Sequence, residues 1–157
     1  KKQFKKIMNY YGDLKLKHKI LDYLLKKFEI NIKPKDYYMN KKEIKYLQSL
    51  GMIIGSHSQS HTLLSRLSYR EQFKELKNSK IFLEKIIKKN IDTFCYPYGG
   101  KISYNDNTLK VLKEIGIELG FKQIMTIEPE KKMKKINNSF LEIARQDHAH
   151  VRRMIYK

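Results

Sequence analysis

The stretch GMIIGSHSQSHTLLSRLS, residues 51–68, carries the signals that decide the fold. An apolar run at 52–55 leads into two histidines spaced four residues apart, and a leucine-rich run then ends at Ser68. The apolar run predicts a short buried strand, whereas Ser68 followed by Glu71 three residues later predicts a capped helix start. A strand that passes through a polar loop into a helix is the repeating unit of parallel α/β folds.

The segments on both sides of this stretch continue the alternation. Apolar spacing upstream predicts three helices, at residues 4–11, 13–28 and 40–50. Downstream it predicts a helix from 68 to 87, a strand and turn at 91–100, a helix at 107–115, and strands at 117–125 and 139–147. We therefore expect an α/β fold with a parallel sheet or barrel, forming one domain over residues 1–157 with a helical N-terminal part at 1–50.

The charge of the chain raises the question of a nucleic-acid partner. The net charge is +18 over 157 residues, and almost all of the positive charge comes from lysine spread through every segment. Arginine, which is suited to bidentate contacts with phosphate and guanine, is scarce. We therefore favour a solvated basic surface over a nucleic-acid site, and attraction to anionic glycans or envelopes remains open.

Signals for membranes, export and disulfides are missing from the sequence. No apolar stretch is long enough to cross a bilayer, and residues 1–13 lack the apolar core of a secretory signal. The single cysteine, Cys95, excludes an intrachain disulfide and a cysteine-cluster zinc site. Because the sequence does not begin with methionine, we interpret it as a processed product or as a piece of a longer chain. Its compartment, bacterial cytoplasm or cell envelope, is left open.

His57 and His61 form the first candidate site. Two histidines at positions i and i+4 lie on one side of a helical turn, and both can reach one ion at about 2.0–2.1 Å, the usual zinc–imidazole distance. We expect hydroxyl groups between and beside the histidines to hold their second ring nitrogens; these hydroxyls belong to Ser58, Ser60 and Thr62. The alternative is a pair of polar loop residues without a metal, since a catalytic zinc normally has three protein ligands.

The stretch TFCYPYGG, residues 93–100, forms the second candidate site. Pro97 and the glycine pair end a strand in a turn, and such a turn can present backbone N–H groups to an oxyanion. The alternative is an ordinary turn. Because ligand sites of parallel α/β folds gather where strands end, we expect this turn and His57 to open on the same groove.

The two motifs together resemble those of the polysaccharide deacetylases, the NodB-homology domain of carbohydrate esterase family four, over residues 38–145. GSHSQSHTLLSRLS, residues 55–68, is similar to the second motif of the family, and the resemblance makes His57 and His61 metal ligands. FCYPYGG, residues 94–100, is similar to the third motif. It implies that Pro97, Tyr98 and Gly99 line the substrate groove and that Tyr98 gives a backbone N–H to the oxyanion.

The resemblance implies a partial or distorted (β/α) barrel and a metal-dependent hydrolase. Its substrate would be an N-acetylated polysaccharide or amino-sugar glycan, and its cofactor a divalent metal ion, with zinc expected. In the family the ion polarises the acetyl carbonyl and activates water, an aspartate removes the water proton, and a histidine protonates the leaving amine.

The sequence departs from the family at the first motif, a strand that ends in paired aspartates. No Asp-Asp pair occurs in the chain, and the upstream candidates Asp13, Asp22 and Asp36 stand in helical or connector contexts. The domain is therefore expected to be incomplete or to have lost one ligand and its general base. Because positioned general-base catalysis is typically worth about 10²–10⁴-fold, we expect residues 1–157 alone to be inactive or very weakly active.

Two further departures concern the late part of the chain. Many family members carry an arginine where this chain has Cys95, and Arg145 could supply the missing charge. The late Leu-x-x-His motif is absent as well, and His148 and His150 are the nearest substitutes.

The sequence leaves three functions open: a deacetylase present as a fragment or shortened chain, a non-catalytic relative that binds glycan, and a basic nucleic-acid-binding module.

Overall fold

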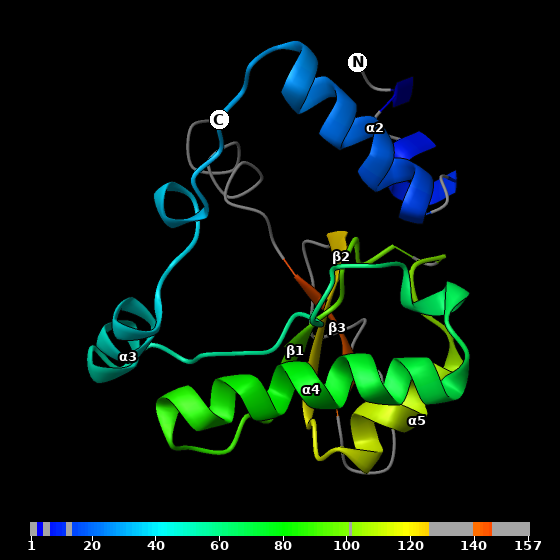
Figure 1. Ribbon diagram of the computed structural model, residues 1–157. Coiled ribbons are helices and arrows are strands. Elements are labelled where there is room, and N and C mark those ends of the chain that lie inside the picture. The colour runs from blue at the N-terminus through cyan, green and yellow to red at the C-terminus, as the bar shows by residue number, and fades with distance from the viewer. Residues whose placement is uncertain (1–2, 5–6, 12–13, 101, 126–139, 146–157) are drawn as a thin grey trace, which may run out of the picture. The chain divides into compact units, whose positions relative to one another are not determined.

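The structure, a computed structural model, describes residues 3–4, 7–11, 14–100, 102–125 and 140–145 (Figure 1). The chain divides into two compact units, Lys1–Asn40 and Lys41–Lys157. This boundary assigns residues 41–50, which we grouped with the helical N-terminal part, to the second unit. The expected single domain over residues 1–157 stays a prediction.

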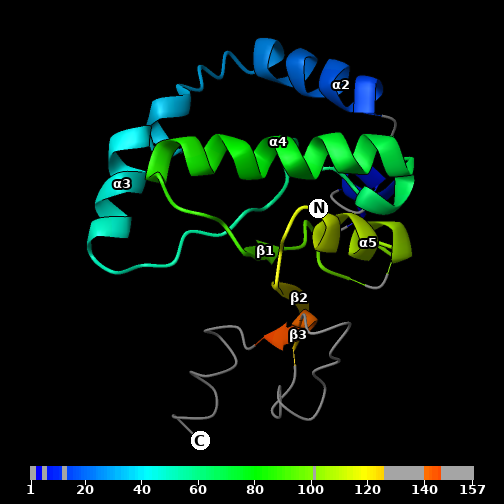
Figure 2. The same ribbon diagram turned by 90° about the horizontal axis from the view of Figure 1, so that it is seen from below.

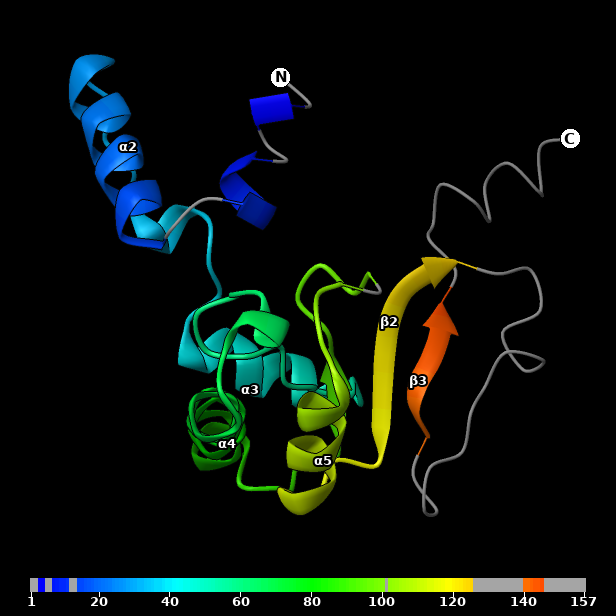
Figure 3. The ribbon, with the colours of Figure 1, turned by 90° about the vertical axis from the view of Figure 1, so that its right-hand side faces the viewer.

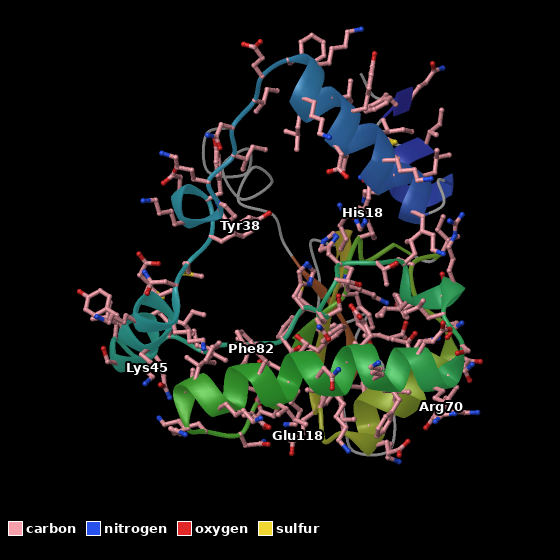
Figure 4. The ribbon with its side chains drawn as sticks, in the orientation of Figure 1. His18, Tyr38, Lys45, Arg70, Phe82 and Glu118 are labelled. Carbon is pink, nitrogen blue, oxygen red and sulfur yellow. The ribbon has the colours of Figure 1, made fainter. Side chains whose placement is uncertain are left out.

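The first unit is helical. A π-helical turn, η1, spans Ile7–Tyr11, the helix α2 spans Leu14–Lys27, and a 3₁₀ turn, η2, spans Pro34–Asp36. Lysines in the last turn of α2 lie where the helix dipole favours positive charge. The helix predicted at 13–28 is confirmed. Of the helix predicted at 4–11, residue 4 is helical, residues 7–11 form the π-helical turn, and residues 5–6 lie outside the described residues. His18 is exposed on α2 (Figure 4).

The helices of the second unit begin and end at the residues that their capping signals indicate. The helix α3 spans Lys41–Ser49 and is followed by Gly51, whose φ of 85° terminates it. The helix α4 spans Tyr69–Ile87, and Ser68 and Glu71 form the predicted capping box at its start. None of the helices in the described part of the chain combines the length and apolar character that crossing a membrane requires.

The sheet has the predicted parallel arrangement. Its strands are β1 (Thr93–Cys95), β2 (Leu119–Met125) and β3 (Phe140–Arg145), all parallel and in the order β1-β2-β3 (Figure 2). Figure 3 shows α3, α4 and α5 on one side of β2 and β3. The helix α5 spans Asp106–Glu114, one residue earlier than predicted, because Asn105 and Thr108 form a capping box. The second unit is therefore the α/β part of the chain.

The strand predicted at residues 52–55 is not formed. Only Ser56 pairs with β1: its N–H donates to the Thr93 carbonyl at 2.9 Å, and its own carbonyl accepts from the Cys95 N–H at 2.9 Å. Met52 and Ile53 are exposed, Ile53 to 82%, and only Ile54 packs partly against the core, so little burial holds the run against the sheet. The single bridge still places the residue before His57 beside the end of β1.

The core of the second unit lies between α4, α5 and the strands. Leu76 of α4 and Phe94 of β1 are almost fully buried, and burying such a side chain contributes about 1.5–3 kcal/mol. Tyr96, directly after β1, donates its hydroxyl to the Leu141 carbonyl of β3 at 2.6 Å and stacks on Tyr104 with ring centroids 4.2 Å apart. Tyr96 therefore fastens the sheet beneath the turn at Pro97.

Candidate active site

The imidazole of His57 is held by the end of β1. Its Nδ1 atom lies 2.6 Å from the carbonyl oxygen of Cys95. A carbonyl oxygen only accepts hydrogen bonds, so Nδ1 carries the proton and donates it, which leaves the lone pair on Nε2. Imidazoles that bind metals are typically oriented by such a bond from the other ring nitrogen.

His61 and Tyr98 lie next to His57. The ring centroids of His57 and His61 are 4.9 Å apart at an interplanar angle of 69°, and those of His61 and Tyr98 are 4.8 Å apart at 67°. The structure thus brings together the two sequence motifs, as expected for loops that follow neighbouring strand ends. The roles assigned to these residues remain predictions.

The histidines do not lie on a helical turn, as their spacing had suggested. Residues 57–62 form no helix, and Ser58 and His61 have φ angles of 63° and 53°. Tyr98 is also left-handed, with a φ of 62°. Such conformations cost about 1–3 kcal/mol each in residues other than glycine and persist where the surroundings impose them. The rings therefore converge because of a strained loop.

Two side chains of α4 fix this loop. The Oε1 atom of Glu75 accepts hydrogen bonds from the Ser60 N–H at 2.5 Å and from the Ser60 hydroxyl at 2.8 Å. One turn later on the same face, the Ser79 hydroxyl lies 2.9 Å from that of Ser56, and both serines are buried. The loop is therefore tied to α4 on both sides of His57.

The Tyr98 turn is held mainly by backbone contacts. The Gly99 N–H donates to the Pro97 carbonyl at 2.7 Å, and the Gly99 carbonyl accepts from the Gln123 N–H of β2 at 3.1 Å. Pro97 and Gly99 are buried, and a Cβ atom on Gly99 would lie 2.4 Å from the Gln123 nitrogen. Only glycine permits this approach, so the turn is locked to β2.

A groove of about 560 Å³ opens on the α4 side of His57. Phe82 projects into it from α4 with 54% of its surface exposed (Figure 4). Its walls mix apolar surface with amide and hydroxyl groups of Ser58, Gln59, Asn78 and Ser79. Such a lining suits a ligand that has an apolar face and hydroxyl groups around it.

Several residues named from the sequence lie outside the described residues or in the first unit. Arg145 ends β3, and its side chain lies outside the described residues, as do Asp13, Asp147, His148 and His150. Asp22 and Asp36 belong to the first unit. Within the described ranges no group of three or more His, Cys, Asp or Glu side chains could hold a metal ion. The described site therefore offers two ligands.

These two ligands fit a divalent metal in their chemistry. Imidazole nitrogens are common zinc ligands, and two of them on one tetrahedral ion lie about 3.3 Å apart when each bond is about 2.0–2.1 Å. The edge contact between the rings of His57 and His61 allows such an approach. The tautomer that the Cys95 carbonyl imposes on His57 is the one that binding through Nε2 requires.

Sequence reasoning missed the groups that orient the histidines. We expected Ser58, Ser60 and Thr62 to hold the second ring nitrogens, but a backbone carbonyl does so for His57, and Ser60 bonds to Glu75. A backbone acceptor leaves no trace in the residue types. Glu75 and Ser79 did give a weak signal in the sequence, because they place polar groups near Leu76 on the buried side of an amphipathic helix.

Comparison with known proteins places the chain in one family. The family model "Polysaccharide deacetylase" matches residues 17–120. A putative polysaccharide deacetylase of Bacillus subtilis (strain 168), YxkH, is 27% identical over 93 residues, which are 59% of this chain and 31% of that protein. The chain thus spans about a third of the length of this curated relative.

Solved structures show the same similarity. The Streptococcus pyogenes deacetylase PplD in complex with acetate matches with a TM-score of 0.58 and 28% identity, over 68% of this chain and 43% of that one. The polysaccharide deacetylase BC0361 from Bacillus cereus matches with a TM-score of 0.54 and 23% identity, over 68% of this chain and 31% of that one. The second likeness concerns the fold alone.

Proposed function

The chain belongs to the polysaccharide deacetylase family, and from this membership we propose that it carries the metal-binding face of a hydrolase that removes acetyl groups from amino-sugar glycans. One observation carries the proposal: His57, His61 and the Tyr98 turn lie side by side, with the His57 tautomer set by the Cys95 carbonyl. Activity and substrate are proposals because the chain spans only part of its relatives.

The proposed cofactor is zinc, held by Nε2 of His57 and by the His61 ring. A bound zinc ion would polarise the acetyl carbonyl and lower the pKa of a water molecule. The chain itself would hold the acetyl group between the histidines and the turn, and the Tyr98 N–H would donate to the oxygen that becomes negative. Because the turn is locked to β2, this donor would need no rearrangement during the reaction.

The proposed substrate is an N-acetylated polysaccharide. The groove beside His57 offers the Phe82 ring as a platform and neutral amides and hydroxyls as hydrogen-bonding groups, which suits a sugar ring. The net charge of +18 would also draw the protein toward anionic glycan surfaces. The solved relative PplD was bound to acetate, and acetate is the product that the proposed reaction releases.

The test measures acetate released from N-acetylglucosamine oligomers, with zinc and with a chelator. Residues 1–157 should release little or none, and a chain extended upstream by a strand ending in Asp-Asp should release acetate only with zinc. The same extended chain with His57→Ala and His61→Ala is the control and should be inactive. Failure of the extended chain to release acetate contradicts the proposal, and chelator-resistant oligosaccharide binding without acetate release supports the non-catalytic glycan binder.

A further inference from the structure

We infer that Glu75 is a positioning residue for the histidine loop, defined as residues 56–61, and that it holds the conformation in which His57 and His61 share one metal ion. The metal part of this inference rests on the proposed function. The structural part, that Glu75 keeps the two imidazoles together, does not.

The contacts of Glu75 are of the kind that fix a loop. One carboxylate oxygen accepts from both the backbone N–H and the hydroxyl of Ser60, at 2.5 and 2.8 Å. Hydrogen bonds to an ionised acceptor are shorter and stronger than neutral ones. Ser60 directly precedes His61, so these two bonds set the direction in which the chain enters His61.

The loop needs such an anchor because its own conformation is unfavourable. Ser58 and His61 are left-handed, which L-residues adopt only under constraint. Inside the loop, the His61 N–H donates to the Ser58 hydroxyl at 3.1 Å, and Ser56 is tied to β1 and Ser79 at its start. Glu75 supplies the corresponding anchor at the other end, between the two histidines.

The helix that carries Glu75 is itself rigid at this point. The neighbouring Gln72 is fully buried, donates to the Leu67 carbonyl at 2.9 Å and accepts from the Thr108 hydroxyl of α5 at 2.6 Å. Leu76, on the other side of Glu75, is fully buried in the core. A group on a packed helix holds its partner more firmly than one on a loop does.

The chain offers a matched control in Glu71. Its Oε2 atom accepts from the N–H and the hydroxyl of Ser68, at 2.8 and 2.6 Å, one turn earlier on the same helix. Glu71 therefore has the same charge as Glu75 and accepts the same pair of hydrogen bonds from a serine, but that serine is the helix cap. Removing it should affect stability without reaching the histidine loop.

The experiment is a zinc titration of the 157-residue chain and of the variants Glu75→Ala, Glu75→Gln and Glu71→Ala. Removing groups that orient metal ligands typically costs about 10–100-fold in affinity, and we expect at least about 10-fold for Glu75→Ala. Glu75→Gln keeps an acceptor oxygen and should restore most of the affinity. Glu71→Ala should lower the melting temperature but leave zinc affinity within about twofold of the unsubstituted chain.

Proton NMR of the metal-free proteins separates this inference from the proposed function. We expect cross-relaxation between the His57 and His61 rings in the unsubstituted chain and in Glu75→Gln, and its loss in Glu75→Ala. If Glu75→Ala does not fold, Glu75→Asp, which withdraws the carboxylate by one methylene, takes its place with the same expectation. Persistence of the ring contact without the carboxylate overturns the inference, as does equal zinc affinity in Glu75→Ala and Glu71→Ala. If neither the unsubstituted chain nor any variant binds zinc, the proposed metal site is refuted, whereas the positioning role of Glu75 is not.

Discussion

The histidine loop and the Tyr98 turn meet at one site but are held in place by different means. Side-chain hydrogen bonds from Glu75 and Ser79 of α4 fix the loop. The turn is fixed by its backbone, which packs so closely on β2 that Gly99 has no space for a Cβ atom. Substitutions should therefore alter the histidine loop gradually, whereas the Tyr98 turn is either formed or lost.

The division follows from what each side must present. The loop presents imidazole rings, and a ring can be oriented by hydrogen bonds that single substitutions weaken. The turn presents a backbone N–H group, and only the path of the backbone can aim it. Substitutions on the two sides should therefore differ in the size of their effect and in which function they disturb.

The largest effect is expected on the turn, from Gly99→Ala. The new methyl group would lie 2.4 Å from the Gln123 nitrogen, and the residue would keep a φ of 62°. Overpacking and left-handed backbone together should lower the free energy of unfolding by at least about 3 kcal/mol. Urea denaturation measures this change. Gly100→Ala is the control, because a Cβ atom there meets nothing within 4 Å, and an equal loss in both variants would contradict the explanation.

A smaller effect is expected in the histidine loop, from Ser79→Ala. The substitution leaves the buried Ser56 hydroxyl without its partner at 2.9 Å, which should cost about 1–3 kcal/mol of unfolding free energy. Adding Ser56→Ala should recover part of that loss, because no unpaired hydroxyl then remains. A double variant that is destabilised by the sum of the single effects would show that the two serines do not interact.

Alkaline pH should lower the stability of the protein through Tyr96, beneath the turn. Burial, followed by the neighbouring Tyr104 and Glu142, raises the pKa of Tyr96 far above its ordinary value of 10.0. A raised folded-state pKa gives stability that is present below about pH 10 and lost as the pH rises further, at up to about 1.4 kcal/mol per pH unit. Denaturant unfolding between pH 8 and 11 should show a shallower decline in Tyr96→Phe. Identical slopes in both proteins would contradict this assignment.

The smallest effect on stability is expected from Phe82→Ala. The ring is 54% exposed, so its removal should change the free energy of unfolding by less than about 1 kcal/mol. Binding of N-acetylglucosamine oligomers, followed by titration, should nevertheless weaken because the groove loses its aromatic wall. Phe82→Tyr keeps the ring and should bind as the unsubstituted chain does. Unchanged oligomer binding in Phe82→Ala would show that the glycan does not bind in this groove.

Much of the framework of the site could be predicted from local sequence signals. The structure confirms the capping box at Ser68 and Glu71 and the parallel strands β1, β2 and β3. These features could be predicted because capping residues and apolar periodicity act over a few residues. The family was also predicted from the two motifs, and the match over residues 17–120 confirms it.

The arrangement inside the site could not be read in the same way. The spacing of His57 and His61 fits a helical turn, but tertiary anchors impose left-handed residues instead. The Cys95 carbonyl that orients His57 is a backbone group, which any residue would supply. The apolar run at 52–55 looked like a buried strand, yet only Ser56 pairs with β1. These features depend on contacts between distant segments.

The most direct test of the central claim is calorimetric titration of the chain with zinc, alongside His57→Ala, His61→Ala and His18→Ala. We expect one zinc ion per chain and a loss of affinity of at least about 10-fold when either His57 or His61 is removed, because each would then take away one of the proposed ligands. His18 is exposed on the first unit, and its removal should leave the affinity unchanged. Zinc affinity that survives in both His57→Ala and His61→Ala would contradict the claim that these two imidazoles share one ion.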